Sequence, residues 1–391
     1  MAGKIKATEL FLSLGLAASL FSACTPPESG EGTTTTGEKI ESSEGGEGGE
    51  GAATNESLKW ANTFDNDTVI SEFTHKVVVP KYEQYASYTA TLAQAIDAFA
   101  ANPTEATLNA ARDAWTKARI SWEQTETFAF GPAGSLGFDG AMDSWPVNQT
   151  DIEKILASDE PLTEEGVAQL QDTERGMHSI EYILFGTDAS KQVSEFTARE
   201  RQYLPALGQD LNTSADALLA SWTEGIDGQP AYESVFASAG SADNQVYPTT
   251  AAAGQELVSG IIDSLTEVGE EKLEAPFSAQ DTEGLESRFS AQTINDLKSN
   301  LQSAENGYLG QFPETGTIAK ASISTYVAAR DPALDKKVKE QFAAADSALN
   351  SVPTPLEASL TDAAAADEIE QAIAAILQIK STIENEVVPL I

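Results

Sequence analysis

The chain has 391 residues, enough for one large or two medium domains with a sizeable core. It carries 61 Asp plus Glu against 23 Lys plus Arg, a formal net charge of -38 at pH 7. Such a surface repels nucleic acid and attracts cations, so we exclude nucleic acid as a partner. Acidity that keeps an exported protein soluble is a simpler explanation than acidity tuned for a ligand.

Residues 1–23 are predicted to be an export signal, because two lysines precede an apolar run from Leu10 to Phe21. The stretch Leu20–Cys24 resembles a bacterial lipoprotein signal, in which the cysteine is lipidated and becomes the mature N-terminus. An ordinary cleavable signal with a chance cysteine is the alternative, and a transmembrane anchor is disfavoured because the apolar run is short. We therefore expect a lipid on Cys24 that anchors the protein to a membrane of a bacterial cell envelope, with its body in the periplasm or at the cell surface.

Residues 24–56 are predicted to be a disordered acidic linker, since they are mainly Gly, Glu, Ser and Thr with almost no large apolar side chain. An irregular stretch at about 225–247 then separates two sets of predicted helices. We therefore expect a first helical bundle over residues 57–230 and a second over residues 231–391.

The apolar pattern after the linker is helical almost throughout, with little strict alternation of apolar and polar residues. The sequence predicts an all-α fold of two helical-bundle halves. The predicted helices span about 66–101, 104–130, 149–158, 163–186 and 193–222 in the first half, and about 248–271, 282–307, 316–329, 332–348 and 362–387 in the second. The segment 131–148, punctuated by Gly and Pro, is predicted to be an ordered loop between helices.

A weak internal sequence similarity suggests that the two halves form a duplicated four-helix type of bundle. A shift of 179 residues aligns Trp122 with Leu301 and Glu126 with Glu305. A chance match between two amphipathic helices is the alternative. Both histidines of the chain lie in the first half, so imidazole chemistry belongs there.

The stretch GMHSIEYILFG, residues 176–186, places His178 three positions before Glu181. Residues three apart share one face of a helix, so the imidazole and the carboxylate should point the same way. Glu181 falls inside an apolar stripe formed by Val167, Leu170, Met177, Ile180 and Leu184. A carboxylate aimed into a core is costly unless it is paired, hydrogen-bonded or bound to a metal.

The predicted helix at 104–130 has the same unusual feature. Glu126 falls in the middle of its apolar stripe, Arg119 lies beside it, and Glu123 shares a face with Glu126. Facing side chains of a helical bundle are a common place for a metal site. Carboxylates with one imidazole suit iron, manganese or zinc better than copper(I), and the histidine argues against calcium.

A buried ion-pair network is the alternative to a metal site. Arg112, Arg119 or Arg175 could neutralise the glutamates, with His178 merely hydrogen-bonded. From spacing alone this alternative is favoured, because a histidine followed three residues later by a glutamate is a weak pattern.

Three motifs resemble those of imelysin-like proteins. GMHSIEYILFG is similar to the G-x-H-x-x-E signature of that family. ISWEQTETFAFGP, residues 120–132, resembles its tryptophan–glutamate helix ending in F-x-F-G-P, and GFDGAMDSWP, residues 137–146, resembles its Asp-containing loop ending in Trp-Pro. The motifs stand in the family's order, and the resemblance covers most of the chain from about residue 60. Iron-regulated imelysin-like lipoproteins are the nearest subgroup.

The resemblance implies two helical bundles and a site with five metal ligands: Glu123, Glu126, Asp139, His178 and Glu181. We expect Arg119 and Arg175 next to these ligands, in contact with their carboxylates. Asp143 is one helical turn from Asp139 and could take its place as a ligand. It also implies a role in bacterial iron uptake, with iron (or zinc) as the bound metal and other envelope iron-uptake proteins as partners.

Two other functions stay open at this point. The first is a zinc-dependent metallopeptidase, after which the family was named, although H-E-x-x-H is absent and a two-histidine zinc site would have to recruit His75. The second is a non-catalytic module that binds a partner protein or an envelope polymer. We expect a metal-binding lipoprotein for iron acquisition, and not an enzyme.

Overall fold

The computed structural model describes residues 58–391, so the predicted export signal, Cys24 and the acidic linker lie outside the described residues. The described part is helical apart from one small antiparallel sheet, in which β1 (Gln311–Phe312) pairs with β2 (Thr317–Ile318). The all-α prediction is therefore confirmed. All described residues belong to one compact unit, and the predicted domain boundary at residue 230 stays a prediction.

The helices are more numerous and shorter than the sequence suggests. Their bounds in the first half are α1 (Asp67–Phe73), α2 (Val79–Ala101), α3 (Glu105–Glu123), α4 (Pro132–Ser135), α5 (Phe138–Asp143), α6 (Gln149–Ala157), α7 (Glu164–Val167), α8 (Gly176–Phe185) and α9 (Glu200–Thr223). In the second half they are α10 (Tyr232–Ala237), α11 (Thr250–Thr266), α12 (Ala275–Ala279), α13 (Thr293–Leu309), α14 (Ile323–Ala328), α15 (Pro332–Ser351), α16 (Leu356–Ser359) and α17 (Ala366–Thr382). Three π-helical segments extend these helices, at Thr74–Val78, Glu267–Glu274 and Ile383–Val387.

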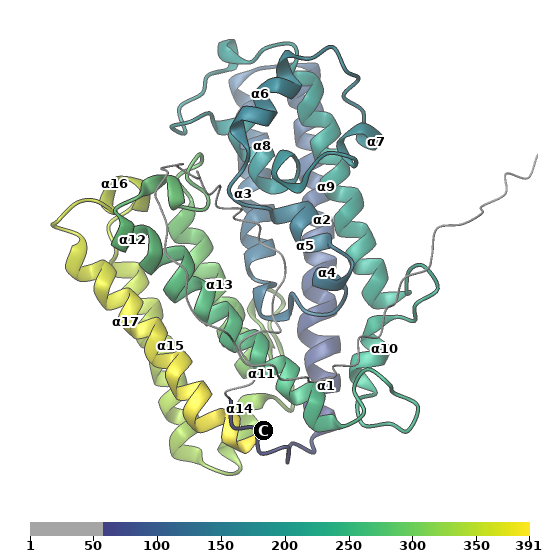
Figure 1. The fold of residues 1–391 in the computed structure, drawn as a ribbon, viewed down its shortest axis with the longest axis vertical. Coiled ribbons are helices and arrows are strands. Elements are labelled where there is room, and N and C mark those ends of the chain that lie inside the picture. The colour runs from purple at the N-terminus through teal and green to yellow at the C-terminus, as the bar shows by residue number, and fades with distance from the viewer. Residues whose placement is uncertain (1–57) are drawn as a thin grey trace, which may run out of the picture. The chain divides into compact units, whose positions relative to one another are not determined.

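The long helices form two four-helix bundles. In the first, α2 packs against α3 and α9, and α8 packs against the same two helices. In the second, α13 packs against α11 and α15, and α17 packs against the same two helices. The bundles stand side by side, with α3 of the first against α13 of the second (Figure 1). One apolar core therefore runs through both bundles.

The end of α3 differs from the prediction. The helix ends at Glu123 rather than near residue 130, because Gln124 leaves the helical conformation and Thr125 Oγ1 donates to the Trp122 carbonyl oxygen over 2.7 Å. Glu126 then begins a 3-10 turn. Glu126 is consequently half-buried and does not continue the apolar stripe of α3.

Four further predicted helices and one predicted loop also differ from the structure. The helix expected at 193–222 begins at Glu200, and the helix expected at 316–329 begins at Ile323, because Thr317–Ile318 form β2. The helix expected at 163–186 is divided, because Gly176 has a φ of +75°, which a continuous α-helix cannot contain. The helix expected at 282–307 begins at Thr293, after Ala291 with a φ of +57°. The loop expected at 131–148 instead contains the short helices α4 and α5.

Among the helices of residues 58–391, none combines the length and the apolar character needed to cross a membrane.

Lys81 is buried where α2 meets the segment that joins β1 to β2. Its Nζ donates to Gln84 Oε1 over 2.7 Å and to Gln124, and forms an ion pair with Glu314 Oε1 at 3.3 Å. Burial lowers the pKa of Lys81 from its ordinary 10.5 to about 8, and Glu314 offsets part of this change.

The stability of the protein should therefore rise with pH between about 8 and 10.5. In this window the unfolded chain keeps the Lys81 proton while the folded chain has lost it, so rising pH favours the folded state. Between these pH values the free energy of unfolding of the wild type should rise by about 3 kcal/mol more than that of Lys81→Met. Urea denaturation at several pH values measures this, with the exposed Lys117→Met as the control. Parallel pH profiles for wild type and Lys81→Met would contradict the expectation.

Candidate metal centre

A cluster of buried charged side chains lies where the first bundle meets the second. The first bundle supplies Arg119 and Glu123 from α3, Asp143 from the end of α5, and His178 and Glu181 from α8. The second bundle supplies Lys272 from the π-helical segment after α11, Glu286 from the irregular segment before α13, and Asp296 from α13. All these side chains are buried, so their charges must be balanced within the cluster.

His178 and Glu181 form a pair within α8. Nδ1 of His178 lies 3.0 Å from Oε2 of Glu181, as the spacing of three residues predicts. The other carboxylate oxygen of Glu181 accepts hydrogen bonds from the N–H and the hydroxyl of Ser290, both over 2.8 Å. Both oxygens of Glu181 are thus engaged, and Glu181 holds the imidazole in one orientation.

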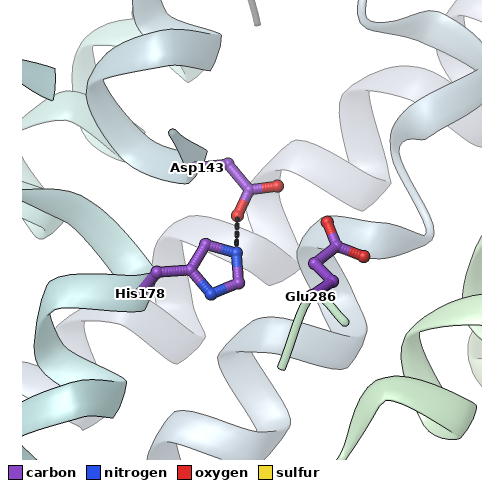
Figure 2. Close-up of side chains that lie close together, drawn as sticks. All are labelled: Asp143, His178 and Glu286. Carbon is purple, nitrogen blue, oxygen red and sulfur yellow. Dashed lines mark ion pairs between the residues drawn. The ribbon is translucent and has the colours of Figure 1, made fainter. Parts of the chain in front are cut away.

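The second ring nitrogen of His178 faces two carboxylates. Nε2 lies 3.3 Å from Oδ1 of Asp143, and the carboxylate of Glu286 lies across from the ring (Figure 2). One ligand atom from each of Asp143, His178 and Glu286 can be chosen so that all lie within 4.8 Å of one another. The Nε2 contact is not aligned as a hydrogen bond. Oε1 of Glu286 lies in ion pairs with Arg119 and Lys272, whereas Oε2 has no hydrogen-bond partner among the described residues. These three side chains therefore face a common point.

Arg119 is the central cation of the cluster. Its guanidinium forms ion pairs with Asp143, with Glu123 at 2.6 Å, with Glu286 at 2.7 Å and with Asp296 at 3.5 Å. Asp143 is also held by Trp122, whose Nε1–H donates to its second oxygen over 2.7 Å. The planar guanidinium reaches four carboxylates at once, which a lysine ammonium could not do with the same geometry.

Lys272 is the second cation, and it comes from the other bundle. Its Nζ lies 3.1 Å from Glu286, 3.4 Å from Glu267 and 3.6 Å from Glu123. Lys272 and Arg119 thus share Glu123 and Glu286 between them, which links the two bundles by charge.

The carboxylates of the cluster outnumber its permanent cations. Burial and the nearby Arg119 lower the pKa of His178, but the contacts with Asp143 and Glu181 outweigh both and raise it to about 10. Burial raises the pKa of Asp296 to about 7, although Arg119 acts in the opposite direction. Protons therefore occupy part of this site near neutral pH, as expected where negative charge is in excess.

Two of the predicted ligands, Glu126 and Asp139, lie in a half-buried group together with Glu267. Burial and Glu267 raise the pKa of Glu126, and burial and Asp143 raise the pKa of Asp139 to about 7. The charges of neighbouring carboxylates, including those of the main cluster, affect the pKa values of Glu126 and Asp139. These two residues are not among the three side chains whose ligand atoms converge on one point.

The predicted arginines are placed differently from one another. Arg119 lies at the centre of the cluster, whereas Arg175 forms an ion pair with Asp210 at 2.8 Å. Arg112 donates to the carbonyl oxygens of Leu184 and Lys191. Part of the ion-pair network weighed from the sequence is thus present, but it is built by Arg119 and Lys272.

Gly176 allows α8 to approach α5 closely. A Cβ atom added at Gly176 would lie 2.4 Å from the carbonyl oxygen of Met142, the residue before Asp143. The close approach places His178 beside Asp143.

Gly176→Ala should therefore destabilise the protein and separate Asp143 from His178. The positive φ of residue 176 alone costs an alanine on the order of 1 kcal/mol, and the contact with the Met142 backbone adds to this. Gly137→Ala is a matched control, because Gly137 has a φ of +71° and open space around it. Thermal unfolding of both variants measures the difference, and equal losses of stability would contradict the proposed contact.

Glu286, Asp296 and Lys272 were not predicted from the sequence. A signal for Lys272 exists, because it continues the apolar stripe formed by Leu257, Ile261, Leu265 and Val268. Asp296 similarly lies among the buried residues of α13. Glu286 lies in an irregular segment, where no periodicity marks it.

Fold and site together define the class of this protein: an all-α protein of two four-helix bundles, with a buried cluster of histidine, carboxylates and arginine where they meet. Residues 78–383 match the family model of imelysin, and the chain therefore belongs to the imelysin family.

Individual relatives agree with this assignment. The chain is 39% identical over 322 residues to iron-regulated protein A of Synechococcus elongatus, covering 82% of this chain and 86% of that protein. Among solved structures, an iron-regulated protein A precursor of Parabacteroides distasonis matches with a TM-score of 0.71 and 23% identity, covering 83% of this chain and 98% of that one. An imelysin-like protein of Psychrobacter arcticum matches with a TM-score of 0.65 and 14% identity, over 82% and 93% of the two chains. These two structures share the fold.

Proposed function

We propose that this protein binds an iron ion between Asp143, His178 and Glu286 and serves iron acquisition at the bacterial cell envelope. The observation that carries the proposal is the convergence of these three buried side chains on one point. The relative from Synechococcus elongatus is described as iron-regulated, which supports iron over other metals of similar chemistry. Oxygen ligands with a single imidazole suit iron, manganese or zinc, so the donor set is compatible with iron.

The hydrogen bonding of the cluster fits such an ion. A metal-binding histidine commonly donates its other ring N–H to a carboxylate, and His178 Nδ1 is already placed against Glu181. Glu181 then orients the ligand, while Nε2, once it has lost its proton, and Oε2 of Glu286 are left to bind. Arg119 and Lys272 would remain as neighbours that hold the ligand carboxylates, each of which has further lone pairs. The predicted ligands Glu123, Glu126 and Asp139 would surround the ion and attract it.

The burial of the three donors favours ion binding over peptide hydrolysis. Asp143, His178 and Glu286 are between 1% and 7% exposed, so a peptide bond cannot reach them in this conformation. The proposed location in the cell is based on the sequence. A lipid on Cys24 would hold the protein to a membrane, and the acidic linker would let the folded part extend away from that membrane. Iron and other envelope iron-uptake proteins are the proposed partners.

Metal titration of the purified protein tests the proposal. We expect one iron ion per chain, counted by elemental analysis after equilibrium dialysis, with zinc and manganese as competitors. Because a metal ligand histidine must be neutral, iron should displace the proton held by His178, whose pKa is raised to about 10. If iron displaces one proton, the affinity of the protein for iron should rise about tenfold per pH unit between pH 6 and about 8. Calorimetry in two buffers of different ionisation heat counts the released protons. Absence of bound metal would leave an ion-pair core and a non-catalytic binding module.

A further inference from the structure

A series of buried aromatic rings leads away from the metal centre through the first bundle. It begins at Trp122, whose Nε1–H donates to Asp143 over 2.7 Å. Tyr85 of α2 packs against Trp122 with ring centroids 5.1 Å apart. Tyr82 lies three residues before Tyr85 on the same helix, so the two rings share one face of α2.

The series continues toward the protein surface. The ring of Tyr82 lies 5.7 Å from that of Trp222 on α9, and Trp222 lies 4.9 Å from Tyr232 on α10. The hydroxyl groups of Tyr232 and Tyr247 are hydrogen-bonded over 2.7 Å. Tyr232 is half-buried, so the series ends near solvent. We name these six residues the aromatic column: Trp122, Tyr85, Tyr82, Trp222, Tyr232 and Tyr247.

Packing and hydrogen bonding account for four of these side chains, including Tyr82, whose hydroxyl donates to the Phe128 carbonyl oxygen over 3.0 Å, but not for Tyr85 and Trp222. Tyr85 is completely buried, and its hydroxyl donates to the sulfur of Met142 at 3.7 Å, a weak acceptor. Trp222 is also completely buried, and its Nε1 has no hydrogen-bond partner among the described residues. A buried donor without a good partner costs about 1–3 kcal/mol, which phenylalanine would avoid. What tyrosine and tryptophan offer over phenylalanine is easier one-electron oxidation.

We propose that the aromatic column is an electron relay between iron at the metal centre and the surface at Tyr232 and Tyr247, used when a peroxide oxidises the bound iron. The inference rests on the proposed iron site. Hydrogen peroxide takes up two electrons and two protons, its O–O bond breaks, and two water molecules form. One electron comes from the ferrous ion, which becomes ferric. The other comes from Tyr232 through the column, and the phenolic proton of Tyr232 passes to solvent as its O–H bond breaks.

The relay would protect the buried metal ligands from oxidation. A ferrous ion that becomes ferric supplies one of the two electrons that peroxide requires, and in the proposed relay the second comes from the column rather than from the ligands. Trp122 is in direct hydrogen-bond contact with Asp143, and it is the entry point through which the column supplies that electron. The oxidised group then forms at Tyr232, the half-buried member of the tyrosine pair, where an external reductant can reach it.

Radical trapping tests the relay. The protein is loaded anaerobically with ferrous iron, mixed with hydrogen peroxide and a nitroso spin trap, and digested for mass spectrometry. We expect the trap adduct on Tyr232 or Tyr247 in the wild type and its loss in Tyr85→Phe and in Trp222→Phe. Tyr88→Phe is the matched control, because Tyr88 lies on the same helix α2 outside the column, and it should keep the wild-type yield.

Bound iron is measured in the same samples, which separates the two proposals. If the wild type binds iron but carries no adduct on the tyrosine pair, or if both column variants keep it, the relay is overturned and the iron site stands. If the wild type binds no iron, the proposed function fails and the relay fails with it. Should Trp222→Phe not fold, Tyr85→Phe decides the matter alone.

Discussion

Arg119→Met should destabilise the protein more than any other single change in the cluster. The guanidinium contacts Asp143, Glu123, Glu286 and Asp296, and its loss removes a counter-charge from all four of these buried carboxylates. Breaking one buried ion pair by removing a partner costs about 3–5 kcal/mol, and this arginine serves four. We therefore expect a loss at or above that range in the free energy of unfolding, measured by urea denaturation at pH 7.

A second arginine serves as the control. Arg330 forms an ion pair with Asp65 at 3.6 Å, and Asp65 is 83% exposed, so Arg330→Met should cost about 0–1 kcal/mol. Arg119→Lys keeps the charge but loses the planar fork, and we expect an intermediate loss. An Arg119→Met variant as stable as Arg330→Met would contradict the central role of this residue.

His178→Ala should abolish iron binding. It removes the one imidazole of the converging set and leaves Asp143 and Glu286 with no nitrogen ligand to share the ion. Replacing an outer residue that orients a metal ligand usually costs about 10–100-fold in affinity, and loss of the ligand itself should exceed this. Equilibrium dialysis with ferrous iron under anaerobic conditions measures the change.

The other histidine supplies the control for this experiment. His75 is exposed and its Nδ1 lies 2.7 Å from the carbonyl oxygen of Ser71, so His75→Ala should bind iron like the wild type. Glu181→Gln distinguishes an orienting residue from a ligand, since we expect a loss of about 10–100-fold rather than complete loss. Unchanged affinity in His178→Ala would remove the basis of the proposed iron site.

The charged residues inside apolar stripes could be predicted from the sequence. Helix periodicity alone places Glu181 among apolar residues, and Glu181 is indeed completely buried. The same periodicity predicts the helical class of the fold, because it depends on local spacing along each helix. The pairing of His178 with Glu181 is also local, three residues apart on one helix, and the structure contains it at 3.0 Å.

Interruptions of the helices were harder to predict. Continued periodicity suggested that α3 extends past Glu126, but the backbone turns after Glu123, and Glu126 leaves the core-facing stripe. Such ends depend on tertiary contacts, here with α11 and α13, which pack against the turn at Glu126–Phe128.

The sequence by itself determined that this protein is helical, that it is strongly acidic and that His178 and Glu181 face its interior, because these properties follow from composition and from spacing within single helices. The tertiary structure alone decided which side chains meet His178. Asp143 and Glu286 stand 143 residues apart in the chain (286 minus 143) and come from different bundles, and no local pattern relates residues at that separation. They meet because the packing of α3 against α13 brings the two bundles together around Arg119.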